Sequence, residues 1–189
     1  VESVFVTDIM FATKHKSTRG NNYCQALVSY KGYITVYPMK HQDEFETALY
    51  WFCKEVGVLV DLIVDRFSAQ KKSSVKRICD QVGNTLKILD RAIPCANRSK
   101  LYAGLLQEVV RKDTRDSNSP MVLWDYAIER RALIHNAVPR PLFQTQGKTP
   151  HECTFGNQSG ISNVCNFGWY EWFYYRDFGS FPKNKEKLG

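Results

Sequence analysis

Val58-Leu59-Val60-Asp61-Leu62-Ile63-Val64-Asp65 is the stretch that decides the fold of this chain. It is short, its apolar residues are β-branched or leucine, and Gly57 comes directly before it. These features predict a strand buried in a sheet. An ionised carboxylate is costly away from water or a partner. A buried strand that ends in Asp65 therefore predicts that this side chain emerges at the edge where α/β sheets bind their ligands.

A second stretch, Ser3-Val4-Phe5-Val6-Thr7-Asp8-Ile9-Met10-Phe11, has the same form. Two strands that each deliver an aspartate predict a divalent metal site, because hard cations prefer carboxylate oxygens. The alternative interpretation is that Asp8 and Asp65 each only cap a turn.

Hydrophobic periodicity and turn residues predict three meandering strands, followed by strands that alternate with helices. Strands are expected over residues 3–11, 23–30, 33–37, 58–65 and 85–89, and helices over 43–56, 73–82, 96–115 and from Pro120, at the first helical position, to just before Pro139. The predicted fold class is α/β, with a mixed five-stranded sheet flanked by helices.

Size and charge set the domain organisation and the class of partner. At 189 residues and 43% hydrophobic content, the chain can bury one core and carry an appendage. We expect a core over residues 1–139, a linker and aromatic-rich extension over 140–178, and a charged tail over 179–189. The chain begins at Val1, which indicates a segment of a longer polypeptide, and no apolar run is long enough to span a membrane. A net charge of +7 favours an acidic partner, nucleic acid first, over an ordinary basic surface.

Cysteine and histidine spacing predicts neither disulfides nor a zinc site. The six cysteines form no C-x-x-C pair, and Cys24, Cys53 and Cys79 lie in apolar periodic runs. They are expected to be buried thiols in a reducing, intracellular compartment. The four histidines are scattered along the chain.

The stretch from Cys165 to Asp177 has seven aromatic residues in thirteen. The favoured interpretation is a segment that packs its rings on the domain. The alternative is a platform on which nucleic-acid bases stack.

Several short motifs together resemble a known family. They are Arg77-Ile78-Cys79-Asp80-Gln81-Val82-Gly83, Asn97-Arg98, Val122-Leu123-Trp124-Asp125-Tyr126-Ala127, Ile134-His135-Asn136, Gly147-Lys148-Thr149-Pro150-His151-Glu152 and Phe167-Gly168-Trp169. With the two aspartate-bearing strands, they resemble the ribonuclease H-like core of retroviral and retrotransposon integrases. The resemblance runs from about residue 3 to 178 and is greatest to copia-type elements, including the divergent group of unicellular algae.

The resemblance implies a chemistry with three carboxylates in a D,D-35-E pattern. These carboxylates hold two Mg²⁺ or Mn²⁺ ions that activate a water or a DNA 3′-hydroxyl in 3′-end processing and strand transfer. Asp8 and Asp65 match the first two positions, although residues 66–70 depart from the usual pattern after the second acid. The implied partners are DNA (element ends and target), further copies of the chain and other segments of a polyprotein. The implied location is the nucleus or a virus-like particle.

The third acid is where the sequence departs from the family. Alignment places it at Lys100, whereas the nearest acid on the same predicted helix is Glu108. Glu108 lies about 80° round the helix and roughly 12 Å further along its axis, so the two positions cannot serve one site. The predicted core face is Leu101, Tyr102, Leu105, Leu106 and Val109, with Lys100, Gly104, Gln107 and Arg111 as the stripe facing the site. Either the third ligand has been lost at Lys100, or Glu108 is the catalytic acid with 42 residues between it and Asp65.

Cations on several elements predict contacts with nucleic-acid phosphates. They are Lys14, Lys16, Arg19, Lys71, Lys72, Lys76, Arg111 and Arg115. The expected function is an integrase core, either active or degenerate. The alternative is a catalytically silent ribonuclease H-like domain that binds nucleic acid or supports an oligomer. A true ribonuclease H ranks lower, because the continuation through Pro139 and Gly147-Lys148-Thr149-Pro150 resembles integrases.

Overall fold

A computed structural model describes residues 4–11, 15–57, 61–65, 72–89, 94–139 and 146–157. The five strands are β1 (Val4–Phe11), β2 (Tyr23–Ser29), β3 (Ile34–Met39), β4 (Asp61–Asp65) and β5 (Thr85–Leu89). The helices are α1 (Phe45–Val56), α2 (Lys72–Val82), α3 (Pro94–Asp116), α4 (Trp124–Ala137) and α5 (Pro150–Phe155). Short 3₁₀ turns, Gln42–Glu44 and Met121–Leu123, lead into α1 and α4.

The strands form one mixed sheet in the order β3-β2-β1-β4-β5. The β1–β2 and β2–β3 pairs are antiparallel, whereas β1–β4 and β4–β5 are parallel. This topology confirms the predicted α/β class and the mixed five-stranded sheet. The aromatic stretch and the charged tail lie outside the described residues.

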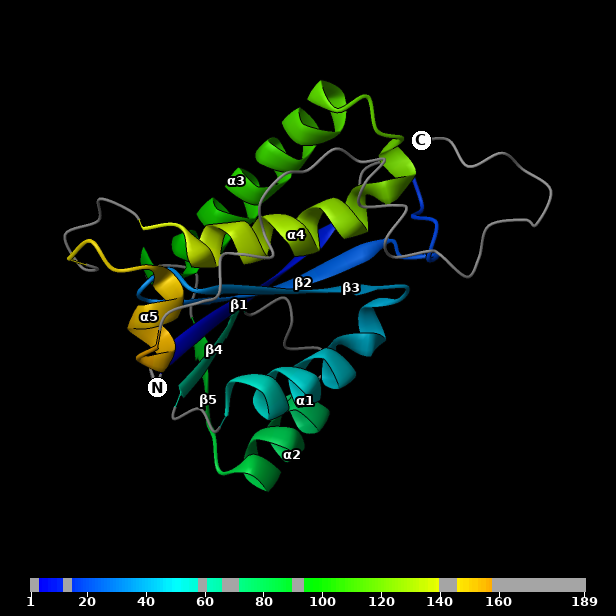
Figure 1. Cartoon of the computed structure of the whole chain (residues 1–189). Helices are drawn as coiled ribbons and strands as arrows, with labels where there is room; N and C mark the ends of the chain where they lie inside the picture. Colours follow the sequence, from blue (N-terminus) through cyan, green and yellow to red (C-terminus); the bar gives the residue numbers. More distant parts are fainter. Residues whose placement is uncertain are drawn as a thin grey trace.

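Helices cover the sheet on both faces (Figure 1). On one face, α1 and α2 pack on a continuous apolar cluster in which Phe5, Phe52 and Leu62 are fully buried. On the other face, α3 and α4 pack over β1, β2 and β3. A second apolar cluster on this face includes Tyr102 and Leu106. Because side chains alternate along a strand, β1 contributes to both clusters.

The Gly147–Glu152 motif builds the start of α5. The Thr149 hydroxyl accepts a hydrogen bond from the Glu152 backbone N–H at 3.0 Å, and the Glu152 carboxylate accepts one from Thr149 N–H at 2.7 Å. This is a capping box with Pro150 at the start of the helix, where its missing N–H costs nothing. The motif therefore has a structural explanation in helix initiation.

Two local expectations were wrong. Pro120 is the N-cap of the 3₁₀ turn before α4, and not the first residue of a helix. The core face of α3 is also different from the predicted one, because Leu101 and Leu105 are 61% and 43% exposed. The buried stripe consists of Ser99, Tyr102, Ala103, Leu106, Val110 and Thr114. Ser99, Ala103 and Thr114 are the small residues of this stripe, on the side of α3 that packs on the sheet and on α4.

Candidate functional site

The two predicted aspartates lie on neighbouring parallel strands. The β1–β4 register pairs Thr7 with Val64, so the next step along both strands brings Asp8 level with Asp65. Asp65 is the last residue of β4 and pairs with Leu89 of β5. The register thus brings the two positions together at the edge where β4 ends. The side chain of Asp65 is outside the described part of the structure.

Asp8 belongs to the face of the sheet that α3 and α4 cover. Its neighbours on the same side of β1, Val6 and Met10, are buried in clusters on that face. The Asp8 side chain is half-buried, and its Oδ1 accepts a hydrogen bond from Ile9 N–H at 2.9 Å. One carboxylate oxygen is therefore oriented by the backbone.

Helix α3 separates the two candidates for the third position. Ser99 is only 2% exposed, so this turn of the helix lies against the protein, while Lys100 and Glu108 are both exposed. At 100° per residue, Lys100 lies roughly 90° from the centre of the buried stripe and Glu108 roughly 170° from it. Lys100 is thus on the flank of α3, and Glu108 is on the side that faces away from the sheet.

The predicted phosphate-binding cations fall into three groups. Lys16, Lys76, Arg111 and Arg115 are exposed. Lys14, Lys71 and the side chain of Lys72 lie outside the described residues. Arg19 forms the third group, because it is part of an internal ionic cluster.

This cluster joins the loop between β1 and β2 to α4. Arg19 Nε donates to Asp125 Oδ2 at 2.8 Å, and its Nη2 is 3.0 Å from Glu129 Oε2. Asp125 is fully buried and also accepts hydrogen bonds from Asn21 Nδ2 at 2.8 Å and Tyr126 N–H at 2.9 Å. Burial works to lower the pKa of Arg19, but its bonds to Glu129 and Asp125 outweigh burial and raise it. Arg19 is therefore a structural anchor, and we reassign it from the phosphate-binding set.

Two further bonds fix the same loop to the start of α4. Thr18 N–H donates to Val122 O at 2.9 Å, and Trp124 Nε1 donates to His15 O at 3.2 Å. Sequence reasoning missed Asp125 as a buried partner of Arg19. The available signal was a single acid, Asp125, directly after the apolar run from Val122 to Trp124, because a buried acid needs a cation. This signal does not indicate which cation it is.

None of the four cysteines whose side chains the structure describes forms a disulfide. Cys24 and Cys79 are buried, and Cys53 and Cys153 are half-buried. Burial raises the pKa of Cys79 to about 11 and that of Cys24 further. Among the described residues, no three His, Cys, Asp or Glu side chains gather in a group that could hold a metal ion. No helix in the described ranges has both the length and the apolar character that crossing a membrane requires.

Comparisons with known proteins support the fold. No family model matches the sequence, and no curated protein matches it. A chain in the cryo-EM structure of the simian T-cell lymphotropic virus intasome, in complex with the PP2A regulatory subunit B56 gamma, is similar in structure, with a TM-score of 0.66 at 14% sequence identity. The match covers 84% of this chain and 56% of the intasome chain, so this chain spans just over half of its length. Together with the sheet order, this likeness shows that the chain has the predicted ribonuclease H-like fold.

Proposed function

We propose that this chain is the core domain of a copia-type retrotransposon integrase, which binds DNA but has lost strand-transfer activity. The observation that carries the proposal is the β1–β4 register, which brings Asp8 level with Asp65 on the sheet that α3 crosses. The integrase-type fold and the Gly147–Glu152 motif support the same assignment. The loss of activity rests on Lys100 at the position of the third acid.

The residues present match only part of a two-metal site. Asp8 and Asp65 are the proposed metal-binding carboxylates, because carboxylate oxygens are the ligands that Mg²⁺ and Mn²⁺ prefer. An ammonium group such as that of Lys100 has no lone pair to offer a metal and favours the ionised state of carboxylates near it. In an intact site, two bound ions would supply an activated oxygen nucleophile for the phosphodiester. Two carboxylates with Lys100 in the third position therefore do not fit a site for two metal ions.

Glu108 does not supply the missing ligand in this proposal. It is exposed on the side of α3 that faces away from the sheet, roughly 12 Å along the helix from Lys100. A ligand must place its oxygen within about 2.6 Å of the ion. Bringing Glu108 to the strand pair would require α3 to turn by about half a revolution, which would expose Leu106 and Val110.

DNA binding is proposed to use the exposed cations around this edge. Lys16 is in the loop after β1, Lys76 is on α2, and Arg111 is on the same stripe of α3 as Lys100. Contacts with phosphates release counterions, so affinity should fall steeply as salt rises and should depend little on sequence. A filter-binding titration on duplex DNA checks this. Binding that is absent at low salt, or that is unchanged up to moderate salt, would contradict it.

The catalytic half of the proposal is tested by a disintegration assay with Mn²⁺. The unmodified chain, Lys100→Glu and Glu108→Gln are compared at equal concentrations. We expect negligible activity from the unmodified chain and from Glu108→Gln, and weak activity from Lys100→Glu. Robust activity of the unmodified chain that Glu108→Gln abolishes would show that Glu108 is the third ligand and that the proposal is wrong.

A further inference from the structure

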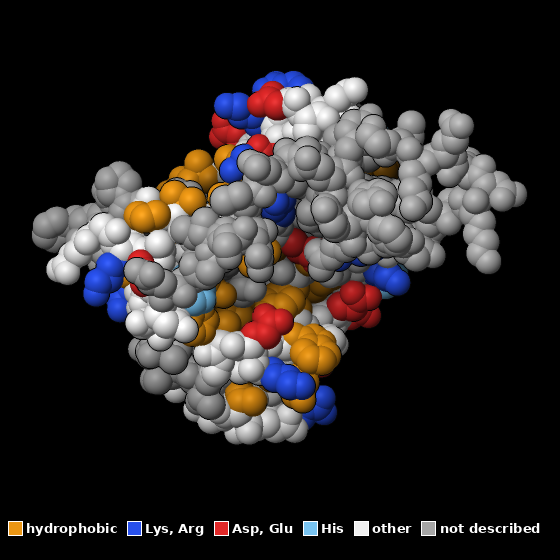
Figure 2. Space-filling view, viewed as in Figure 1, with side chains coloured by type: hydrophobic (Ala, Val, Ile, Leu, Met, Phe, Trp, Pro, Cys, Tyr) orange, Lys and Arg blue, Asp and Glu red, His pale blue; other side chains and the backbone are white. Residues whose placement is uncertain are grey.

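An apolar groove lies between α3 and α4 on the outside of the domain. Its volume is about 310 Å³, and Leu105 and Val109 of α3 face Ile134 and Val138 across it. Two of the large hydrophobic side chains that are exposed among the described residues line this groove, namely Leu105 at 43% and Val138 at 46%. Figure 2 shows hydrophobic side chains gathered over α3 and the C-terminal end of α4. An open groove lined by exposed apolar side chains is a candidate docking surface.

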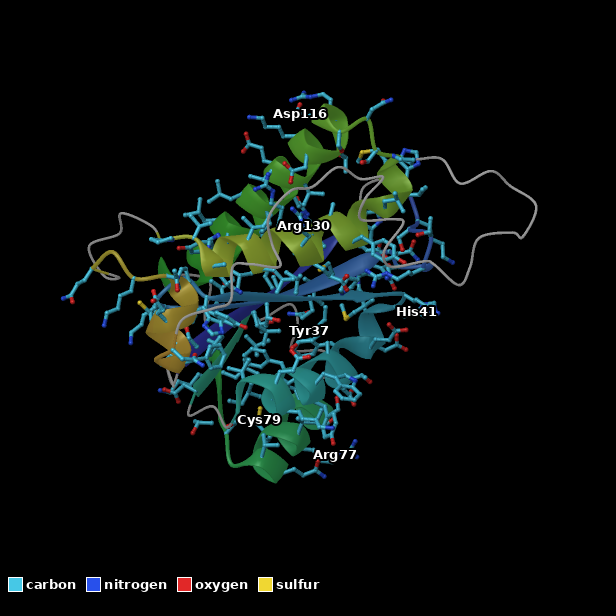
Figure 3. The ribbon with its side chains drawn as sticks, viewed as in Figure 1. Tyr37, His41, Arg77, Cys79, Asp116 and Arg130 are labelled. Atoms are coloured by element: carbon cyan, nitrogen blue, oxygen red, sulfur yellow. The ribbon has the colours of Figure 1, made fainter. Side chains whose placement is uncertain are left out.

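The groove continues into a second hollow of different character. The second hollow, of about 280 Å³, is lined by Asp113, Asp116 and Arg130, and it shares Arg131 and Ile134 with the first. In Figure 3, Asp116 lies at the C-terminal end of α3 and Arg130 lies on α4. The two hollows therefore form one groove that is apolar at the end near Val138 and charged at the end near Asp116.

The described chain ends close to the apolar end of this groove. Helix α5 contacts α4, and Phe155 packs its ring on Tyr33 with 5.2 Å between the ring centroids. Tyr33 directly precedes Ile34, which lines the groove. The chain thus leaves the described structure at Asn157, beside β3 and the end of α4.

The residues after Asn157 include aromatic side chains followed by charged ones. This is the same order as the apolar and charged ends of the groove. Residues 158–189 carry nine aromatic side chains, and seven of them lie between Phe167 and Tyr175, directly before Arg176 and Asp177. Starting from the apolar end, the aromatic residues come first and the two charged residues follow. Arg176 and Asp177 are complementary to Asp116 and Arg130 at the charged end. The ten residue steps from Asn157 to Phe167 can span up to roughly 33 Å.

We propose that residues 165–177 dock in the α3–α4 groove of their own chain, with the aromatic rings at the apolar end and Arg176 near Asp116. Each aromatic ring can bury about 150–250 Å². The short tether gives the segment a high effective concentration at the groove, which a free peptide or a second copy lacks. The C-terminal extension is then fixed along α3, the helix that carries Lys100. The proposal is independent of DNA and metal binding.

Hydrogen exchange of the full-length chain, measured by mass spectrometry, tests the docking. We expect the amides of 165–177 to be protected, and Leu105→Asp or Val138→Asp to raise their exchange rate at least tenfold. Both substituted side chains are more than 40% exposed, so the domain should still fold, which unchanged exchange in β1 and β4 would verify. Trp51→Ala is the matched control, because Trp51 is an exposed aromatic residue on α1, and it should leave 165–177 unchanged.

The orientation has its own test. Asp116→Arg should raise the exchange of residues 173–177, and Arg176→Asp in the same chain should restore their protection. A double variant that exchanges as fast as Asp116→Arg would overturn the orientation.

Three outcomes would overturn the docking proposal. The first is exchange of 165–177 at the rate of an unfolded peptide. The second is protection that disappears on dilution, which would indicate that a second copy fills the groove. The third is protection that appears only when a single-stranded oligonucleotide is added, which would assign the aromatic residues to base stacking.

Discussion

The two faces of the sheet are packed by different kinds of side chain. The face under α1 and α2 is continuous and apolar, and Phe5, Phe52 and Leu62 have no exposed surface there. The face under α3 and α4 combines apolar packing with the ionic cluster around Asp125 and leaves a groove open between its helices. Asp8 belongs to this second face. The first face is therefore a closed apolar core, and the second also holds the positions on which the proposed function depends.

The largest expected change in the free energy of unfolding comes from a substitution on the apolar face under α1 and α2. Phe52→Ala should lower the free energy of unfolding by about 3–5 kcal/mol, because it removes a fully buried ring and leaves a cavity. Leu105→Ala, in the open groove of the other face, should cost less than about 1 kcal/mol because Leu105 is 43% exposed. Urea denaturation measures both values. Equal losses would contradict the exposure of Leu105 in an open groove.

The next effect concerns the ionic cluster. Arg19→Ala leaves the fully buried Asp125 without its cation, which should cost about 3 kcal/mol. Asp125→Asn in the same chain should recover part of the loss, because the remaining group is neutral. Arg115→Ala, at an exposed arginine, should change stability by no more than about 0.5 kcal/mol. If Arg19→Ala weakens DNA binding without lowering stability, Arg19 returns to the phosphate-binding set.

The third expected effect is alkaline destabilisation, to which both faces contribute. Burial raises the pKa of Cys79 to about 11 and that of Cys24 further, whereas an unfolded cysteine ionises near pH 8.5. Below that pH both states are protonated and stability is constant. Above it the unfolded state loses the protons first, so stability falls as the pH rises towards 11. Denaturation at pH 8, 9 and 10 should show the fall, and Cys24→Ala or Cys79→Ala should each make it shallower. Identical slopes in all three proteins would contradict this.

The fold could be predicted largely because strands are short and local. The apolar stretch ending at Asp65 and its counterpart around Asp8 each formed a strand, although β4 is described only from Asp61. Their adjacency follows from the sheet order, which comes from the structure and not from the sequence pattern. The side-chain period of two also fixes which residues of a strand share a face.

The helix-borne part of the site was harder to predict. The largest apolar residues of α3 suggested a core face through Leu101 and Leu105, whereas the buried stripe runs through Ser99 and Ala103. Close packing on the sheet and α4 selects small side chains, a preference that hydrophobicity alone does not reveal. The partnership of Arg19 with Asp125 joins residues 106 positions apart, and no local pattern indicates it.

Binding of Mn²⁺, followed by isothermal titration calorimetry, tests the central claim that Asp8 and Asp65 form a metal site in which Lys100 replaces the third ligand. Lys100→Glu should bind Mn²⁺ at least tenfold more tightly than the unmodified chain, and adding Asp8→Asn should abolish the gain. Lys112→Glu makes the same charge change at an exposed lysine of α3 and should leave affinity as it is in the unmodified chain. Equal affinities of Lys100→Glu and Lys112→Glu, or tight binding by the unmodified chain that Glu108→Gln removes, would contradict the account.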